Sequence, residues 1–156
     1  MKVELRERTE ETVRIYFETV RRQGLDRTLP QRAKTAEEAV EDYRQTLLPG
    51  AKSYGRTIWV DGTYAGDVWC YGIEPAGEPG AMVSYCVFAE YQGKGVAAEG
   101  VSLFLKDTDG RYGCKSYGAF VYLDNIPSVR VLEKCGFRLM EEIEEGRLSG
   151  YFQLDR

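Results

Sequence analysis

Histidine is missing from this chain of 156 residues, and its absence narrows the chemistry that the chain can perform. Without an imidazole there can be no Ser-His-Asp triad and no Cys-His pair, and there is little scope for zinc, because each of these sites depends on histidine as base or ligand. Any catalysis must use carboxylates, hydroxyls, backbone dipoles or a cofactor. We therefore expect no bound metal.

Long apolar runs and paired cysteine motifs are missing as well. No stretch approaches the roughly 20 apolar residues that span a bilayer, and residues 1–8 are charged rather than signal-like. No Cys-x-x-Cys spacing occurs among Cys70, Cys86, Cys114 and Cys135, which favours reduced thiols over a disulfide framework. We expect a cytoplasmic protein that does not associate with membranes.

The amino-acid composition is typical of one ordinary globular domain. A hydrophobic share of 43% can build a core, and a charged share of 29% keeps the surface polar. The formal net charge of -4 gives no support to nucleic acid as a partner. No repeat, low-complexity segment or linker divides the chain, so we expect residues 1–156 to form a single domain.

Two amphipathic helices are expected in the first third of the chain. Apolar residues recur at helical spacing over 13–20 and again over 36–47, where Thr35 and Glu38 form a Thr-x-x-Glu capping box. A loop over 24–34, which contains Pro30, separates them. A short strand over 2–7 is expected before the first helix.

After Pro49-Gly50 the pattern becomes strand-like. Strands are expected over 56–60, 63–73, 82–88, 117–123, 137–144 and 148–154, with the Asp61-Gly62 hairpin signal between the first two. Helices are expected from 97 to about Gly110 and over 125–135, the second closed by Gly136. The order β-α-α-β-β-β-α-β-α-β-β predicts an α/β fold with a mixed sheet of about seven strands and helices on both faces.

The junction between the strand over 82–88 and the next helix is rich in small residues. Gln92, Gly93, Lys94, Gly95, Val96 and Ala97 lie there. Successive amides at such a junction can point at one anion, and the helix N-terminus adds about half a positive charge. Two other interpretations stay open on these residues alone: a turn that only allows close packing, and a dinucleotide fingerprint Gly-x-Gly-x-x-Ala. The fingerprint calls for an acidic residue about 20 positions on, where Gly113 stands.

The segment also resembles the pyrophosphate motif Gln/Arg-x-x-Gly-x-Gly/Ala of the GNAT acetyltransferases, with Gln92, Gly95 and Ala97 in register. Residues 125–137 resemble the Asn-x-x-Ser…Leu-Glu-Lys-x-Gly-Phe stretch of the Rim-type branch, which acetylates protein N-termini. Tyr85 and Glu90-Tyr91 also resemble that branch, and the order of elements is similar to the whole family fold. The resemblance implies a domain that uses acetyl-coenzyme A.

The resemblance implies where the coenzyme lies. The family holds it in a V-shaped opening between two parallel strands, here 82–88 and 117–123. Backbone groups of Val87 and Phe88 are then expected to pair with the pantetheine arm, and the amides of residues 92–97 to hold the pyrophosphate. Asn125 and Ser128 are expected near the pantetheine and the thioester.

For catalysis the resemblance implies direct attack of an amine on the thioester. Many family members use a helix tyrosine as the acid, but Leu132 stands at that place here. Ser128 becomes the candidate acid, with a helix cap as its alternative, and Tyr85 lies beside the thioester as a donor or a wall. The base is expected among the late carboxylates Glu141, Glu142, Glu144 and Glu145, of which Glu144 is our candidate. Glu90 is the other choice, although the resemblance implies that it shapes the loop. Cys86 is expected to point into the core.

The acceptor is expected to be a small-molecule amine or a protein N-terminus. The aromatic residues Trp59, Tyr64, Trp69 and Tyr71 could line its pocket or could simply pack across strands. The loop over 24–34 is expected to form another wall of that pocket. A coenzyme-binding module with reduced catalysis, acting as a sensor, is the alternative function, and a homodimer is one assembly open to the chain.

Overall fold

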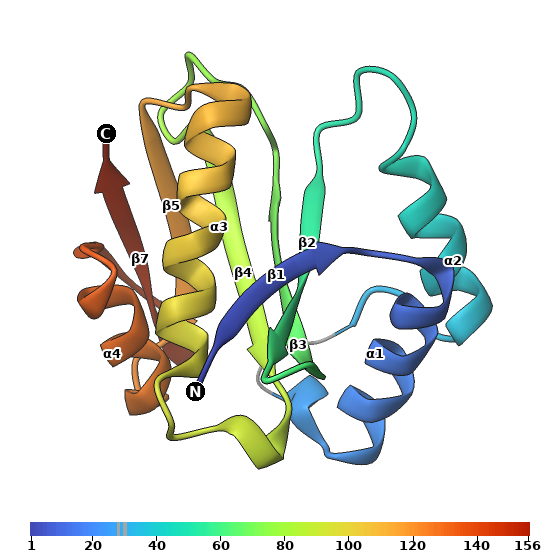
Figure 1. Cartoon of the computed structure of the whole chain (residues 1–156). Coiled ribbons are helices and arrows are strands. Elements are labelled where there is room, and N and C mark those ends of the chain that lie inside the picture. The colour runs from blue at the N-terminus through green and yellow to red at the C-terminus, as the bar shows by residue number, and fades with distance from the viewer. Residues whose placement is uncertain (28, 30) are drawn as a thin grey trace.

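The computed structural model describes residues 1–27, 29 and 31–156, and the chain forms one seven-stranded mixed sheet with helices on both faces (Figure 1). Pro30, in the loop expected between the first two helices, lies outside the described residues. The order of elements matches the expected one: β1 (Val3–Glu7), α1 (Glu10–Arg22), α2 (Ala36–Gln45), β2 (Tyr54–Val60), β3 (Thr63–Tyr71), β4 (Ala81–Val87), α3 (Val96–Tyr112), β5 (Ser116–Tyr122), α4 (Ile126–Lys134), β6 (Arg138–Glu145) and β7 (Arg147–Asp155).

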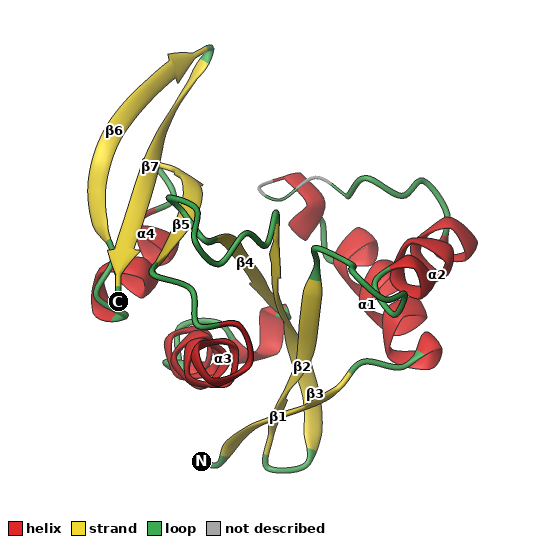
Figure 2. Cartoon of the chain, turned by 90° about the horizontal axis from the view of Figure 1, so that it is seen from above, coloured by secondary structure: helices red, strands yellow, loops and turns green. Residues whose placement is uncertain are grey.

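The strands lie in the order β1-β2-β3-β4-β5-β7-β6, and every neighbouring pair is antiparallel except β4 and β5. Helices α1 and α2 lie on one face, and α3 and α4 lie on the other (Figure 2). The core gathers under α3, where Val101, Phe104 and Leu105 are buried against strand residues such as Ile58. The apolar periodicity of α3 thus decides which face it covers.

Local signals set the ends of most elements. Asp61 and Gly62 both have positive φ, 49° and 81°, as a two-residue type I′ hairpin requires. Thr35 caps α2 by accepting from the Glu38 N–H, whereas the Glu38 carboxylate accepts from the Lys34 N–H, so the expected box closes one residue earlier. Several boundaries differ from expectation: β2 begins two residues earlier, at Tyr54, and β3 ends two residues earlier, at Tyr71. Helix α3 runs through Gly110 to Tyr112 and ends at Gly113, and Leu47 lies beyond α2, 64% exposed.

Strands β4 and β5 part soon after they meet. They pair only at Ala81 with Tyr117 and at Met82 with Gly118. Each is held on its outer side: β4 pairs with β3 from Tyr71–Met82 up to Gly66–Val87, and β5 pairs with β7 along its whole length. The two strands therefore follow different neighbours and diverge, which confirms the V-shaped opening.

The aromatic residues of the β2–β3 hairpin are used for packing. The Trp59 and Tyr64 rings stack with centroids 5.4 Å apart, and Trp69 meets Tyr16 edge-on at 6.0 Å. Because these rings contact each other and α1, they stabilise the sheet and do not line the opening. None of the helices formed by the described residues has the length and apolar character needed to cross a bilayer.

Candidate active site

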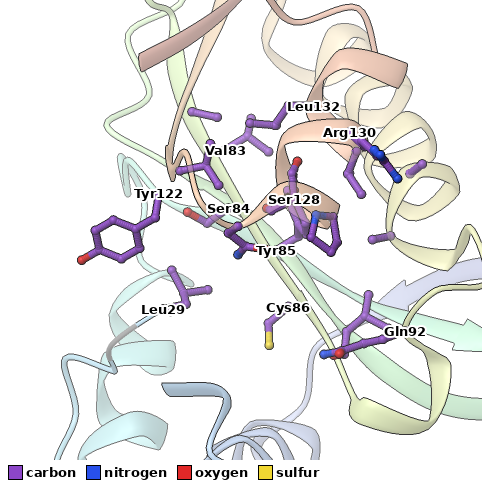
Figure 3. A pocket seen from close by; sticks show the side chains of 18 of the residues that line it. Leu29, Val83, Ser84, Tyr85, Cys86, Gln92, Tyr122, Ser128, Arg130 and Leu132 are labelled. Atoms are coloured by element: carbon purple, nitrogen blue, oxygen red, sulfur yellow. Dashed lines mark hydrogen bonds between the residues drawn. The ribbon is translucent and has the colours of Figure 1, made fainter. Parts of the chain in front are cut away.

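A cavity of about 1030 Å³ occupies the opening between β4 and β5 (Figure 3). Its walls come from β4, from the segment between β4 and α3, from β5 and from the start of α4. The first half of the α1–α2 loop and the β6–β7 hairpin close the remaining side through Leu25, Leu29, Ile143, Glu145 and Ser149. Elements far apart in sequence thus meet at the point where the sheet splits.

The alternation of side chains along β4 divides the cavity into two halves. Tyr85 points toward α4 and contacts Ser128, whereas Cys86 points to the other face and contacts the Tyr16 hydroxyl on α1. Figure 3 shows Ser84, Leu29 and Tyr122 on one side of Tyr85, and Gln92 and Arg130 on the other. The expectation that Cys86 belongs to the core is wrong, since it lines the cavity. Burial raises the pKa of its thiol to about 11, so it is protonated at neutral pH.

The N-terminus of α3 opens into the half of the cavity that Gln92 and Arg130 line, called here the coenzyme half. Gly93 and Gly95 have φ of 72° and 81°, and no atom lies within 4 Å of where their Cβ atoms would be. The first helical hydrogen bond runs from the Glu99 N–H to the Gly95 carbonyl, so the amides of residues 96–98 precede the helical ladder. This glycine-rich turn and helix start, residues 92–97, form a cradle with space for an anion. Lys94 is exposed and does not line the cavity.

Side-chain amides hold this cradle in place. Gln92 Nε2 donates to the Val87 carbonyl at 3.0 Å, which ties the loop to the end of β4. On the outer side, Gln23 Nε2 donates to Glu90 at 2.9 Å, and Gln23 Oε1 accepts from the Ala89 N–H at 2.8 Å. Glu90 thus binds the end of α1 and shapes the loop.

Val87 and Phe88, which were expected to act together, have different environments. The Phe88 N–H donates to the Ala65 carbonyl at 2.8 Å, and its own carbonyl accepts from the Tyr91 N–H. Because backbone groups alternate along an antiparallel strand, the Val87 N–H points away from β3 and into the opening. The expectation that Phe88 pairs with a ligand is therefore wrong: its backbone is engaged within the fold, and its buried ring packs on Tyr16 and Tyr64.

Tyr85 and Ser128 form a hydrogen-bonded pair at the centre of the cavity. Their hydroxyl oxygens are 2.6 Å apart, and the single Tyr85 proton can be donated either to the Ser128 hydroxyl oxygen or to the Ser128 carbonyl, which lies 3.1 Å away. Burial is the largest cause that raises the pKa of Tyr85 to about 12, and the Ser128 hydroxyl partly offsets it. Tyr85 is therefore neutral across the physiological range and able to donate.

The structure argues against the helix-cap interpretation of Ser128. Asn125 is the N-cap residue of α4 and Ser128 lies three positions further on, where its hydroxyl contacts Tyr85. The Asn125 side chain makes no capping hydrogen bond and lines the cavity instead. Leu132, at the place where many relatives of this fold carry tyrosine, is buried in the core and also reaches the cavity wall. The tyrosine hydroxyl that contacts Ser128 comes from β4.

The late carboxylates are distributed over both faces of β6. Glu144 and Glu145 are both exposed, but Glu145 and Ile143 line the cavity and Glu144 does not. Since side chains alternate along a strand, Glu144 points away from the site, and our choice of it as the base is wrong. The pairing of Glu145 with Arg147 across the turn places Glu145 at the cavity instead.

Several lining residues were not anticipated from the sequence. They are Ser84, Phe120, Tyr122, Arg130 and Ser149, whereas Leu25 and Leu29 belong to the loop over 24–34 that was expected to form a wall of the pocket. The alternation of β5 could have indicated Phe120 and Tyr122 once the buried Ala119 was assigned inward. Arg130 stands two residues after Ser128, inside a motif that was already recognised. Ser149 depends on long-range strand pairing that no local pattern encodes.

The parted strands, the amide-rich helix start and the hydroxyl pair define a transferase domain that holds a phosphate-bearing coenzyme. The model of the acetyltransferase (GNAT) domain family matches residues 2–138, and the chain belongs to that family. It is an acetyl-coenzyme A-dependent N-acetyltransferase, with acetyl-coenzyme A as co-substrate. The comparison with curated protein sequences gives no significant match. Within the described residues no cluster of three or more Cys, Asp or Glu side chains is placed to hold a metal ion.

Solved structures share the fold over nearly the whole chain. The ribosomal L7/L12 N-terminal acetyltransferase RimL with coenzyme A superposes with a TM-score of 0.83 at 19% identity, covering 99% of this chain and 94% of that one. The aminoglycoside acetyltransferase AAC(6′)-Ib with coenzyme A gives 0.81 at 17%, covering 99% and 95%. The Vibrio cholerae spermidine N-acetyltransferase with coenzyme A and spermine gives 0.85 at 16%, covering 98% and 95%. RimL is among them, as the sequence motifs indicated.

Proposed function

We propose that the chain acetylates a primary amine, carried by a small molecule or a protein N-terminus, inside the cavity between β4 and β5. The coenzyme would enter from the α3–α4 side and the amine from the α1 side, so that they meet beside Tyr85 and Ser128. The proposal treats residues 1–156 as one catalytic domain. The observation that carries it is the parting of β4 and β5 after Met82, which leaves an open strand edge directly above the cradle.

The residues of the coenzyme half, which Gln92 and Arg130 line, fit a coenzyme. The amides of Gln92, Gly93, Lys94, Gly95, Val96 and Ala97 would hold the pyrophosphate at the positive end of α3. The Val87 N–H would pair with the pantetheine arm or polarise the thioester carbonyl, and Asn125 would bind the arm with its uncommitted side chain. Arg130, exposed and lining the same half, supplies a full positive charge.

The thioester supplies an activated acetyl group: the amine nitrogen bonds to the carbonyl carbon, the carbon–sulfur bond breaks, the nitrogen loses a proton and the sulfur gains one. The chain must therefore donate to the carbonyl oxygen and to the departing sulfur, and it must accept a proton from the amine. The Val87 N–H meets the first need because it points into the opening. A backbone donor costs no reorganisation, since β3 fixes its direction.

The Tyr85–Ser128 pair can donate a hydrogen bond to the departing sulfur. The pKa of Tyr85 is about 12, whereas an ordinary thiol has a pKa near 8.5, so full proton transfer from Tyr85 to the sulfur is uphill by about 5 kcal/mol. A hydrogen bond to a charged acceptor still contributes roughly 1.5–3 kcal/mol. We therefore assign the pair to stabilising the departing thiolate: Tyr85 would donate to the Ser128 hydroxyl oxygen instead of the carbonyl, Ser128 would donate to the sulfur, and the thiolate would take its proton from water after it leaves.

Glu145, in place of Glu144, is our candidate for the group that accepts the proton from the amine. It is the carboxylate that lines the cavity from the β6–β7 hairpin, on the side from which the amine would enter. It can hold the ammonium form, and it can accept the proton directly or through water before attack.

The test is turnover with acetyl-coenzyme A against a panel of primary amines and short peptides. Thiol release should appear with at least one acceptor, and mass spectrometry should find that acceptor heavier by one acetyl group. Coenzyme binding without acetylation of any acceptor would instead favour the sensor module. Absence of coenzyme binding would remove both proposals.

Two further properties belong with this proposal. All four cysteines are free, which fits a reducing compartment such as the cytoplasm. A homodimer remains a prediction, for which the sedimentation velocity of the purified chain is the direct measurement.

A further inference from the structure

The half of the cavity on the α1 side has a composition of its own. Its surface, called here the acceptor wall, is formed by Leu29, Phe120, Tyr122, Ile143, Glu145 and Ser149. Register explains how these residues meet: Tyr122 pairs with Ser149 across β5 and β7, and Ser149 pairs with Ile143 across β7 and β6. Cross-strand partners share a face, so the three side chains form one row.

The acceptor wall carries one carboxylate on a mostly apolar surface. Among the described residues that line the cavity, the charged ones are Glu145 on this wall and Arg130 on the coenzyme side. Arg147 lies near the wall, but its guanidinium pairs with Asp124 at 2.6 Å and covers the Tyr122 ring at 3.9 Å. The charge of Arg147 is thus matched by Asp124. Glu145 is left as the carboxylate that one ammonium group could contact on this wall.

The remaining surface is suited to an apolar body. Phe120 is 57% exposed although it faces the cavity, and Leu29, Tyr122 and Ile143 are only half-buried. Large apolar side chains left open around a single carboxylate are typical of a pocket that binds an amphipathic ligand. A second or third ammonium group would lie against these apolar side chains with no further carboxylate among the described residues that line the cavity.

We infer that the acceptor is a monocationic primary amine attached to an aromatic or aliphatic body, with its ammonium at Glu145 and its body against Phe120 and Tyr122. This inference rests on the proposed function. It sets the chain apart from polycationic acceptors such as spermidine, for which one of the structural neighbours is named.

The experiment compares 2-phenylethylamine, ethylamine, spermidine and ribostamycin as acceptors, with rates corrected for the fraction of free amine. Burial of a phenyl group on the wall should give 2-phenylethylamine at least tenfold higher kcat/KM than ethylamine. Calorimetry with coenzyme A present should show the same order in the affinities of the amines. Phe120→Ala should reduce the gap between 2-phenylethylamine and ethylamine, with coenzyme affinity unchanged.

Glu145→Gln should weaken binding of 2-phenylethylamine by about tenfold, while Glu142→Gln, on the opposite face of the same strand, should leave it unchanged. Preference for spermidine or ribostamycin, or equal behaviour of the two glutamine variants, would overturn the inference while the acetyltransferase proposal stands. Failure to bind the coenzyme or to acetylate any amine would overturn the proposed function, and the inference with it.

Discussion

Two hydroxyls at the centre of the cavity matter most at the scale of single residues. Tyr85 comes from a strand and Ser128 from a helix, and their oxygens are 2.6 Å apart. The burial that raises the pKa of Tyr85 keeps it a donor, and the contact orients Ser128 toward the space where a thioester would lie. A strand tyrosine therefore supplies a hydroxyl to the cavity that Leu132, at the place of the helix tyrosine of many relatives, also lines.

Ser128→Ala and Tyr85→Phe should each lower kcat by roughly tenfold to a hundredfold, because each removes a hydrogen bond that stabilises the departing thiolate. The double variant should lose little more than the worse single variant, since the pair acts as a unit. Steady-state kinetics with the best acceptor measures this.

Coenzyme affinity provides the control for these variants and should fall less than kcat. If kcat holds while the melting temperature falls, the pair is structural. Multiplying losses in the double variant would mean that the two hydroxyls act independently, against the relay proposed for them.

The pH dependence of stability offers a second test of Tyr85. Its pKa is about 12 in the fold and near 10 in the unfolded chain. Above pH 10 the unfolded chain loses this proton first, so the free energy of unfolding falls as pH rises toward 12. Between pH 9 and pH 11 the wild type should lose about 1 kcal/mol more than Tyr85→Phe, measured by urea unfolding. Equal losses would show that the hydroxyl is not held in a buried hydrogen bond.

Ser128 and Tyr85 were chosen separately because they belong to recognisable motifs, and the structure brings their hydroxyls together in the cavity. Glu145 lines the cavity and Glu144 does not. The sequence could not separate them, because the face of a strand depends on its register and the four nearby glutamates do not alternate with apolar residues. Phe88 was assigned to the ligand for a similar reason: whether its amide faces β3 or the opening is decided by Ala65 on another strand.

At the scale of elements, the junction from β4 to α3 was predictable because its cause is local. Glycines at positive φ allow the turn, and the helix start provides free amides whatever the rest of the chain does. The parting of β4 and β5 has no local cause. It follows from the pairing of each strand with its outer neighbour, and only the resemblance to a known fold predicted it.

Gly95→Ala should weaken coenzyme binding by tenfold or more, because a methyl group would enter the space that the phosphates need beside the amides. The substitution also strains the backbone, since φ is 81° at this residue. Gly62→Ala is the matched control: its φ is also 81°, no atom lies within 4 Å of its Cβ position, and it sits in the β2–β3 turn, away from the cradle. Calorimetric titration with acetyl-coenzyme A compares the two.

Both variants should lose similar amounts of stability, of order 1 kcal/mol, because the strain is the same in both. The difference in coenzyme affinity then reports the cradle alone. Equal affinity in Gly95→Ala and Gly62→Ala would mean that the phosphates bind elsewhere.

At the scale of the whole molecule, the order of strands and helices could be derived from periodicity and turn residues, while the way the sheet divides could not. The C-terminal end of α3 shows how tertiary contacts change a boundary. Gly110 was expected to end α3, but the helix continues to Gly113 because Thr108 and Asp109 hold the Tyr117 hydroxyl and keep its last turns against β5. Tertiary contacts thus override a glycine in the helix.

The division of the sheet leads to the last prediction. The two parts of the sheet are joined directly through only two residue pairs between β4 and β5, so a coenzyme lying between these strands would add contacts to both. Acetyl-coenzyme A at a hundredfold excess over its Kd should stabilise the chain by about 2.7 kcal/mol. For a domain of this size that corresponds to a rise in melting temperature of roughly 5–10 °C, measured by calorimetry.

NADH at the same concentration is the control, because it carries a pyrophosphate and an adenosine but no pantetheine arm to bridge the strands. A shift with NADH equal to that with acetyl-coenzyme A would revive the dinucleotide interpretation of Gly93 and Gly95. No shift with millimolar acetyl-coenzyme A would mean that the opening between β4 and β5 does not hold the coenzyme.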